Sequence, residues 1–493
     1  MELLFLFFIT LFTLLVIVYK LQSLRPNKKH LPPSPPGALP FIGHLRLVLS
    51  ANPLHRTLQA LSSNSSQYAD YMLLKLGARN VIVLSSPKAV EECFQKNDVA
   101  FANRPHSIAF DFYSYNYTQI SMADYGPHWR NLRRFTTTKI FSSSSLHASS
   151  DVRHDAVRCL LRDLYRSASS NNGAPHRIDL KLKFFELTFN STMSMMIGEP
   201  IGDGLSHTKE NNWFFDVLRG AKVKKSLAAS SKKRDAYFEE MIERYRTKCL
   251  ATKKPKSILG VLFSLQQEDP EQYNHVIIKG IILAMFTGAT DTTAMTLEWA
   301  MSLLLNNPET LKKALKELDH TIEPHRLLED SDISNLPYIQ SIIQETLRLF
   351  PPAPFLFPHV SASECKLDQY DVPSGTTIVA NAWAIHRDPK LWPEPNKFMP
   401  ERFMQGLQQG ESNNKFKYIP FGIGRRGCPG DGLALRTIAL ALGSVLRCFE
   451  WEKIGDEPID MNEGVQFLLP KAKALEVLCK PRSEMLNVLS NLI

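Results

Sequence analysis

The sequence predicts a mainly α-helical protein with a small β-sheet region and one transmembrane helix at its N-terminus. Three observations support this: 44% of the 493 residues are hydrophobic, long stretches carry the helical period, and strand-like runs are few and short. The βαβ alternation that would indicate a parallel α/β sheet is not visible in the sequence. One large catalytic domain therefore fits better than the roughly three domains that length alone suggests.

The expected elements follow from hydrophobic periodicity along the chain. Helical patterns cover six ranges: 127–141, 237–250, 273–306, 309–320, 337–350 and 431–449. Shorter runs at 80–84 and 376–380 favour strands. Serine- and asparagine-rich patches at 142–145 and 167–172 are expected to be loops between helices.

An uncharged hydrophobic run of seventeen residues covers positions 3–19. This is at the short end of the length that spans a bilayer as a helix. A cleaved secretory signal would need basic residues before the run and a small-residue cleavage site, but Glu2 precedes it, and Arg25 and Lys28 follow it. The positive-inside rule then leaves the C-terminal body in the cytosol, so we expect an uncleaved, single-pass anchor.

Four prolines within residues 31–37 predict a stiff, extended spacer after the anchor. An SH3 or WW ligand is the alternative, but a segment this close to the bilayer is poorly placed for such a partner. The expected domains are a membrane anchor at 1–24, a basic and proline-rich hinge at 25–45, and a catalytic domain at 46–493.

Charge and cysteine content exclude several classes of protein. The net charge of +9 suits an anionic membrane surface or an acidic protein partner as readily as nucleic acid. No dense lysine and arginine block or zinc-finger spacing occurs, so we expect no nucleic-acid partner. The seven cysteines are scattered without a CxxC pair, which argues against a disulfide framework and a structural zinc site. At least one thiol is therefore available for another role.

Residues 422–427 match the GxGxxG pattern of dinucleotide-binding loops. The context argues against that interpretation, because one long helical pattern follows instead of a βαβ unit. In addition, Cys428 occupies the position where the first helical turn would hold a phosphate.

The longer stretch FGIGRRGCPG suits a different chemistry, that of a metal-binding thiolate. Cys428 lies just before a helix N-terminus, whose amide dipoles stabilise a thiolate. Phe421 can pack beside the sulfur, while Gly424 and Gly430 permit a tight turn. Arg426 offers a cation to an anionic group nearby. Thiolate ligation of haem iron needs such surroundings; a lone inert core thiol is the alternative.

This stretch resembles the haem-binding loop of cytochromes P-450, and further motifs of that family follow the expected order over about residues 31–480. Glu345 and Arg348 form an ExxR motif on one helix face, and Arg402 of a PERF motif can bridge to the same carboxylate. In this family the three residues form a structural triad. The resemblance also implies that Cys428 is the axial ligand of the iron in haem b.

The long central helix contains the sequence GATDTT, which is similar to the oxygen-binding segment of the family. Gly288 and Thr292 are four residues apart, so the threonine hydroxyl can compete for backbone bonding and open the helix locally. The resemblance implies two catalytic residues: Thr292 steadies the oxygen molecule, and Asp291 helps to relay protons. The family usually has Ala-Gly where this chain has Gly288 and Ala289. This exchange of the two small residues leaves open a different reaction of the same oxidant, such as closure of a methylenedioxy bridge on a methoxyphenol. A second departure is Asp431, which is expected to cap the following helix.

Further positions match family contacts to the haem or to the substrate. Trp129, Arg133 and His359 match contacts to the haem propionates, with surface packing or a salt bridge as the alternative. Candidates for the substrate pocket are Phe110, Phe112, Gly288, Ala289, Phe355 and Phe467. The aromatic run at 110–117 can stack on an aromatic substrate or be a packed loop. Family topology also places the region 213–223 near the substrate.

Segments 101–105, 381–392 and 448–452 are similar to plant microsomal enzymes of the group that includes isoflavone 2'-hydroxylase. The resemblance implies a membrane-anchored haem-thiolate monooxygenase of the endoplasmic reticulum. It would use O2 and electrons from NADPH, through NADPH-cytochrome P-450 reductase, to hydroxylate a flavonoid, isoflavonoid, lignan or other phenolic. A basic docking face for that reductase is expected at Arg133, Arg134, Lys139, Lys415, Lys417 and Arg425.

Two alternatives to this function remain open. The first keeps the fold but closes a methylenedioxy bridge or another ring by oxidation. The second is a non-catalytic haem- or ligand-binding membrane protein, which the presence of both Asp291 and Thr292 disfavours.

Overall fold

The computed structural model describes residues 13, 29–169, 175–198, 224–250, 257–404 and 415–493. Apart from Thr13, the expected anchor at 1–24 lies outside the described residues, as does the expected substrate-facing region 213–223. Within the described part, one helical stretch, His275–Asn306, is long and apolar enough to cross a membrane. Most of its apolar window is buried inside the protein, as in a core helix.

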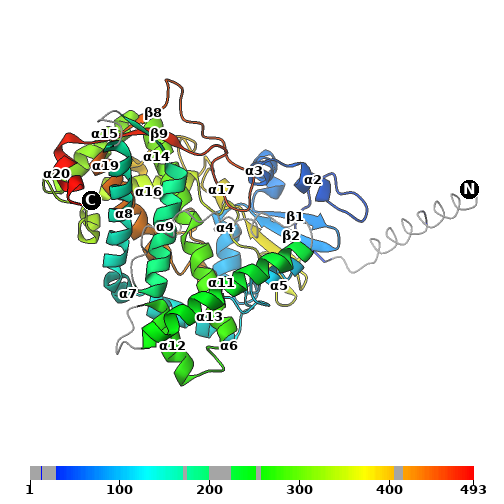
Figure 1. The fold of residues 1–493 in the computed structure, drawn as a ribbon. Helices are drawn as coiled ribbons and strands as arrows, with labels where there is room; N and C mark the ends of the chain where they lie inside the picture. Colours follow the sequence, from blue (N-terminus) through cyan, green and yellow to red (C-terminus); the bar gives the residue numbers. More distant parts are fainter. Residues whose placement is uncertain (1–12, 14–28, 170–174, 199–223, 251–256, 405–414) are drawn as a thin grey trace, which may run out of the picture. The chain divides into compact units, whose positions relative to one another are not determined.

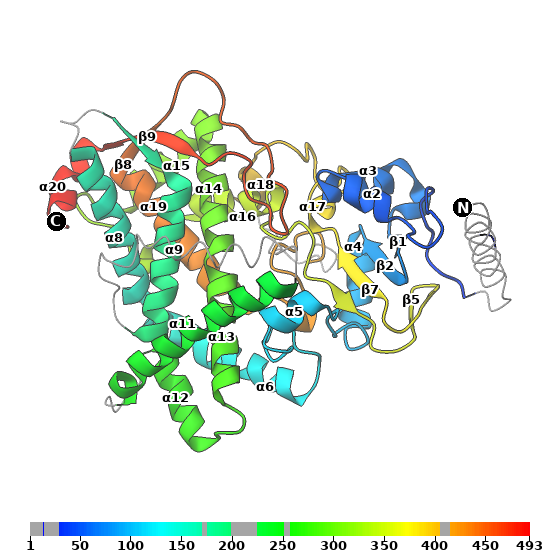
Figure 2. The same ribbon diagram turned by 45° about the vertical axis from the view of Figure 1, so that its right-hand side comes forward.

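Unit 1, the smaller of two compact units, comprises residues 1–105, 355–385 and 423–426. Its four-stranded sheet has the order β1 (Tyr71–Leu76), β2 (Arg79–Leu84), β7 (Thr377–Ala380) and β4 (His359–Val360). Only the β2–β7 pair is parallel (Figure 2). The other elements are α2 (Leu45–Ser50), α3 (Leu54–Asn64), α4 (Pro87–Glu91), α17 (Ala382–Ile385), the hairpin of β5 (Cys365–Leu367) and β6 (Tyr370–Val372), the short 3-10 helices η1 (Ser66–Tyr68) and η7 (Gly424–Arg426), and the short π-helix η2 (Glu92–Lys96).

A small hydrophobic core holds the sheet of unit 1 against α3. Leu58 of α3 packs with Met72 of β1 and Val83 of β2, and all three are almost fully buried. The segment before α2 approaches β1 closely at Gly43, whose φ is +60°. A Cβ atom at this position would lie 2.1 Å from the carbonyl oxygen of Lys75, so only glycine fits there.

Unit 2 comprises residues 106–354, 386–422 and 427–493 and is mostly helical. Its helices are α5 (Ile108–Tyr113), α6 (Pro127–Phe135), α7 (Ser143–Ala148), α8 (Ser150–Ser169), α9 (Leu180–Ile197), α11 (Lys224–Leu250), α12 (Ile258–Glu268), α13 (His275–Ala289), α14 (Asp291–Asn306), α15 (Pro308–Thr321), α16 (Pro337–Leu349), α18 (Glu401–Met404), α19 (Asp431–Cys448) and α20 (Leu486–Ser490). A π-helix, η3 (Thr136–Ile140), continues α6, and η5 (Asp330–Asn335) and η8 (Ser483–Met485) are short 3-10 helices. An antiparallel sheet joins β3 (His176–Asp179), β9 (Glu476–Pro481) and β8 (Phe449–Lys453) in that order. Helices α8, α9 and α14 lie side by side (Figure 1).

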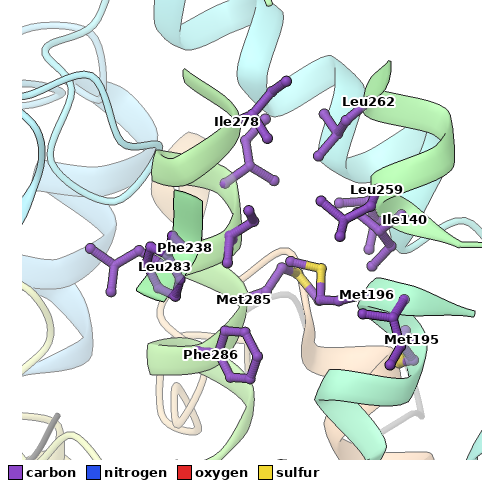
Figure 3. Packing of buried hydrophobic residues seen from close by; sticks show 14 of the residues in the cluster. Ile140, Met195, Met196, Phe238, Leu259, Leu262, Ile278, Leu283, Met285 and Phe286 are labelled. Atoms are coloured by element: carbon purple, nitrogen blue, oxygen red, sulfur yellow. The ribbon is translucent and has the colours of Figure 1, made fainter. Parts of the chain in front are cut away.

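The main core of unit 2 lies between α9, α11, α12 and α13. Met196 of α9 and Met285 of α13 extend toward one another in this core, beside Leu259 of α12 (Figure 3). Phe286 of α13 packs with its ring 6.4 Å from that of Phe238 on α11. This core fixes the position of α13, the helix that leads into the GATDTT segment.

The structure confirms the predicted mainly α-helical fold with a small β-sheet region, all six predicted helical regions and both predicted strands. The transmembrane helix of that prediction lies outside the described residues. The prediction of loops was wrong at residues 143–145, which lie in α7, and at 167–169, which lie in α8. The serine-rich sequence starts a helix here, because Ser142 caps α7 by accepting a hydrogen bond from the amide of Ser145. Helix α9 was not predicted, since apolar residues surround it and leave no one-sided pattern.

Candidate active site

The Cys428 loop lies directly before α19, as the sequence predicts. The amide of Cys428 donates a hydrogen bond to the carbonyl of Phe421 (2.8 Å), which closes the loop. The Cβ position of Gly430 is 4.0 Å from the sulfur of Cys428 and 3.5 Å from the ring of Phe141, so glycine leaves room for both. Asp431 does not cap α19, whose cap position is Gly430, but its Oδ1 accepts a hydrogen bond from the Gly432 amide (2.8 Å).

Opposing influences act on the thiol of Cys428. Although the side chain keeps exposed surface, the surrounding protein atoms bury it enough that desolvation raises its pKa. The amide of Gly430 and the charge of Arg133 lower that pKa, while Asp431 raises it. The protein alone therefore favours the thiol. A metal cation held by this sulfur would supply the charge that makes the thiolate the stable form.

Helix α6 carries the WxxxR motif to this loop. Arg133 donates through Nη1 to the carbonyl of Gly427 (2.6 Å), so it contacts the residue before Cys428. Burial lowers the pKa of Arg133, and the nearby Cys428 and Asp431 raise it. Trp129 is buried and donates its indole N–H to the carbonyl of Ile120 (3.1 Å). Trp129 thus anchors the connection between α5 and α6.

The central helix is interrupted where the sequence predicts an opening. Helix α13 ends at Ala289 and α14 begins at Asp291, with Thr290 at φ −84° and ψ −71° between them. The hydroxyl of Thr292 donates to the carbonyl of Gly288 (2.6 Å). Gly288 is exposed, and Asp291 and Thr292 are partly exposed, although most residues on either side of them are buried. An ideal Cβ at Gly288 meets no atom within 4 Å. The interruption therefore presents backbone and hydroxyl groups to an accessible space.

The ExxR and PERF motifs meet in a buried network. Glu345 accepts hydrogen bonds from Arg348 at both carboxylate oxygens, at 2.7 and 2.8 Å. Arg402 donates through Nε to the same carboxylate (3.2 Å), as does the amide of Met399 (3.0 Å). Glu345 and Arg348 are fully buried, so each charge depends on the other for compensation.

His386 extends this network toward the Cys428 loop, and sequence reasoning missed it. Its carbonyl accepts from Nη1 of Arg348 (2.7 Å), and its Nε2 accepts from the amide of Ile419 (2.9 Å), two residues before Phe421. Burial, followed by the charges of Arg348 and Arg387, lowers the pKa of His386 to about 3. Its neutral imidazole is therefore a permanent acceptor. In the sequence, His386 lies in the segment 381–392, which resembles plant microsomal enzymes, but no local pattern marks this histidine as a structural acceptor.

In unit 1, three basic side chains gather around the loop at η7. His359 is buried and bonded through Nδ1 to the carbonyl of Phe101 (2.7 Å), and Arg426 donates to the carbonyl of Ala102 (2.8 Å). Arg104, which sequence reasoning did not single out, is buried, and desolvation followed by the charge of Arg426 lowers its pKa to about 9. Burial, then Arg104, and more weakly Arg426 lower the pKa of His359, against the bond to Phe101. The positive charges of Arg104 and Arg426 suit an anionic ligand.

Gly424 fixes the backbone of the same loop within unit 1. Its φ is +73°, and a Cβ there would lie 2.3 Å from the carbonyl oxygen of Phe94. The predicted tight turn therefore requires glycine at this position. Next to it, Arg425 forms an ion pair with Asp98 at 2.8 Å.

The candidate substrate residues lie in different surroundings. Phe110 and Phe112 are partly buried on α5, in unit 2, and Phe467 is 51% exposed in the same unit. Phe355 belongs to unit 1, where it packs against the core that includes Leu58. Gly288 and Ala289 stand at the helix interruption. Their roles toward a substrate stay predictions.

Comparisons with known proteins agree with this site. A family model for cytochrome P450 matches residues 32–476. Isoflavone 2'-hydroxylase from Glycyrrhiza echinata is 39% identical over 97% of this chain and 96% of its own length. The (+)-piperitol/(+)-sesamin synthase from Sesamum radiatum is also 39% identical, over 96% of each chain. A zebrafish cytochrome P450 structure with abiraterone aligns with a TM-score of 0.75 at 25% identity, over 87% of this chain and all of that one. The chain therefore belongs to the cytochrome P450 family, whose members are haem b monooxygenases supplied with NADPH electrons by a reductase.

Proposed function

We propose that this cytochrome P450 hydroxylates an aromatic plant specialised metabolite of the flavonoid, isoflavonoid, lignan or other phenolic class. The observation that carries this proposal is the interrupted central helix, where Thr292 and Asp291 border an accessible space in a mostly buried helix. A non-catalytic binding protein has no need of these groups. The substrate class follows from relatives named for isoflavone and lignan chemistry.

The residues present fit haem b. In unit 2, Cys428 would hold the iron through its sulfur, and Arg133 and Trp129 would lie on the propionate side. In unit 1, the guanidinium of Arg426 suits an anionic group such as a carboxylate. The expected role of His359 toward the propionates stays part of the proposal. When bound, haem supplies a redox iron at which dioxygen is reduced and one oxygen atom is passed to the substrate.

The residues of the helix interruption would handle the protons that this reaction consumes. The Thr292 hydroxyl gives its proton to the carbonyl of Gly288, so its oxygen lone pairs face the accessible space as acceptors. Water held there can receive protons that Asp291 passes inward from its carboxyl group. The hydrogen bond fixes the direction of the hydroxyl, which keeps the acceptor site in place.

The proposal includes a single-pass anchor at 1–24 in the membrane of the endoplasmic reticulum, with the catalytic domain at 46–493 in the cytosol. The uncharged run at 3–19 and the basic residues after it support this arrangement. Removing residues 1–24 should release the protein into the soluble fraction of cells. Retention in membranes at the level of the full chain would contradict an anchor in this segment.

The proposed electron donor is NADPH-cytochrome P-450 reductase. Of the expected docking residues, Arg133 and Arg425 are engaged within the protein. Arg134, Lys139 and Lys415 are exposed in unit 2 and are better placed to meet an acidic partner. Reversing the charge at Lys139 should raise the reductase concentration needed for half-maximal turnover, and more so at low salt.

Closure of a methylenedioxy bridge is a second candidate function. The observation that favours it is the open space beside Gly288, at the position where the family usually carries a methyl group. A relative is named (+)-piperitol/(+)-sesamin synthase, and its sequence matches nearly the whole chain. The extra room would let a bulkier methoxyphenol approach the oxygen site.

Two experiments test these proposals on the full-length protein in microsomes. The reduced protein should give the CO difference spectrum of a thiolate-ligated haem, and a spectrum typical of histidine ligation would exclude both functions. The protein is then incubated with a panel of phenolic compounds, reductase and NADPH, and the masses of the products distinguish hydroxylation from bridge closure. Hydroxylation adds one oxygen atom, whereas bridge closure removes two hydrogen atoms.

A Thr292→Ala variant tests the proton-handling role. It removes the hydroxyl but leaves Cys428 untouched, so the CO difference spectrum should stay thiolate-like. NADPH consumption should continue while product per NADPH falls severalfold, because protons are no longer delivered in order. Unchanged coupling of NADPH use to product would contradict the role assigned to Thr292.

A further inference from the structure

We propose that the buried guanidinium of Arg234 is a substrate-recognition group that binds a carbonyl or similarly strong acceptor oxygen on the aromatic substrate. This inference rests on the proposed function and narrows its substrate class to aromatic compounds that carry such an oxygen.

Arg234 lies on α11 and is only 1% exposed. Its Nη2 donates to the carbonyl of Phe112 (2.8 Å) and to the hydroxyl of Ser231 (3.0 Å). Its Nε and Nη1 atoms have no hydrogen-bond partner in the described part of the chain. The guanidinium also lies over the ring of Tyr115, 4.8 Å from its centroid. A full positive charge is therefore buried with only part of its donors satisfied.

A buried charge with unpaired donors destabilises a protein, so the unpaired Nε and Nη1 atoms of Arg234 require an explanation. Among the described residues, no carboxylate hydrogen-bonds to Arg234. Its neighbour Asp235 is bonded instead to Lys279 (3.1 Å). Arg153, which is equally buried, shows the usual solution, since it forms an ion pair with Asp330. In the part of the chain that the structure describes, the Tyr115 hydroxyl is a nearby group that could accept, but it makes no hydrogen bond in the structure.

A second unpartnered donor lies in the same region. Gln119 is 1% exposed, and its Oε1 accepts from the hydroxyl of Ser121 (3.1 Å), while its Nε2 makes no geometrically sound hydrogen bond to any residue that the structure describes. Tyr113 connects the two groups. Burial raises the pKa of Tyr113, and hydrogen bonding to Thr287, the charge of Arg234 and hydrogen bonding to Gln119 lower it. Arg234 and Gln119 thus both lie close to Tyr113.

This position lies next to the proposed reaction centre. Thr287 immediately precedes Gly288, whose carbonyl receives the hydrogen bond from Thr292. A substrate that reaches the helix interruption would therefore pass close to Tyr113 and the donors around it. The polar end of the substrate and the carbon to be oxidised would then be held by neighbouring parts of unit 2.

The chemistry of these groups selects the ligand. The guanidinium and the amide nitrogen can only donate hydrogen bonds, so the ligand must accept them. The Tyr115 ring beneath the guanidinium favours a flat, aromatic partner. A hydrocarbon substrate would leave both donors unpaired. A ring carbonyl conjugated to an aromatic system, as in isoflavones, supplies the missing acceptor.

The test compares two ligands on the haem-loaded, full-length protein. One is a hydroxylated isoflavanone, and the other is the isoflavan that differs from it only in lacking the ring carbonyl. Affinities are measured from the ligand-induced change in haem absorption and, independently, by equilibrium dialysis. The wild type should bind the isoflavanone about 10- to 100-fold more tightly, the value of hydrogen bonds to a charged group.

Arg234→Leu should remove this preference by weakening isoflavanone binding while isoflavan binding changes less than about twofold. Arg234→Lys keeps one donor and should retain part of the preference. The matched control is Arg244→Leu, an exposed arginine on the same helix, which should bind both ligands as the wild type does.

The outcomes separate this inference from the proposed function. A thiolate-type CO spectrum with equal affinity for the two ligands in the wild type would overturn the inference and leave the monooxygenase proposal intact. So would an Arg234→Leu variant that keeps the wild-type preference, because the arginine would then serve structure alone. If Arg234→Leu fails to load haem, the Arg234→Lys variant and the wild-type ligand pair decide the question.

Discussion

Two buried arginines of unit 2, Arg348 and Arg234, show how the partners of a charge decide its role. Both are at most 1% exposed. Arg348 donates to both oxygens of Glu345 and to the carbonyls of His386, Pro395 and Lys397. Arg234 donates to one carbonyl and one hydroxyl and leaves two nitrogens unpartnered.

This difference in hydrogen-bond partners indicates a structural role for Arg348 and a ligand-binding role for Arg234. When every donor of an arginine is already hydrogen-bonded within the protein, none is available to a ligand. Substitution of that arginine then breaks many contacts at once. A buried charged group with unpaired donors destabilises the ligand-free protein, and a ligand that accepts hydrogen bonds from these donors removes part of that cost. The comparison predicts opposite behaviour: Arg348 should matter for stability and Arg234 for ligand affinity.

Substitution of Arg348 should have the largest effect. Arg348→Leu leaves the buried carboxylate of Glu345 with Arg402 and the Met399 amide as its remaining described partners, and should lower the free energy of unfolding by about 3–5 kcal/mol. Urea denaturation, followed by haem absorption, measures the change. The matched control is Arg158→Ala, which removes the exposed ion pair with Asp155 and should change stability by less than about 1 kcal/mol. Similar losses in both variants would contradict the scaffold role.

His386 should show a smaller effect that reaches the Cys428 loop. His386→Leu leaves the amide of Ile419 buried without an acceptor, which should lower the free energy of unfolding by about 1–3 kcal/mol. His386→Gln offers a carbonyl oxygen at a similar position and should restore most of the loss. The CO difference spectrum should become less thiolate-like over time in the leucine variant only. Equal decay in the two variants would show that the imidazole acceptor is unimportant.

The pH dependence of stability follows from the same imidazole. Its pKa of about 3 in the folded protein lies below the ordinary 6.5, so between these values only the unfolded chain binds the proton. Stability from this group is complete above pH 6.5 and falls as the pH falls. At pH 5.5 the loss should be on the order of 1 kcal/mol. Urea midpoints at pH 7.5 and 5.5 should show this extra loss in wild type relative to His386→Gln, and parallel curves would refute it.

The sequence predicted the features that depend on local spacing. The position of Cys428 before α19, the interruption beside Thr292 and the pairing of Glu345 with Arg348 all follow from residues within one or two helical turns. These patterns work because the helical register fixes which side chains can meet.

The features that the sequence did not reveal depend on tertiary packing. Arg234 meets the carbonyl of Phe112 across 122 residues, and His386 meets the amide of Ile419 across 33. Nothing in the local sequence of α11 marks Arg234, which stands in a polar stretch beside two lysines. In the sequence its neighbours are typical of a solvated helix surface, and the packing of α5 against α11 brings the Phe112 carbonyl to Arg234.

The smallest effect on stability is expected at Arg234 itself. Arg234→Leu loses two hydrogen bonds, but it also removes two orphaned donors and a buried charge. These changes oppose one another, so the ligand-free protein should unfold within about 1 kcal/mol of the wild type. Urea denaturation without ligand measures this, and adding the isoflavanone should then stabilise the wild type more than the variant. A loss of unfolding free energy as large as that of Arg348→Leu would mean that both arginines have a structural role, which would contradict the different roles assigned to them.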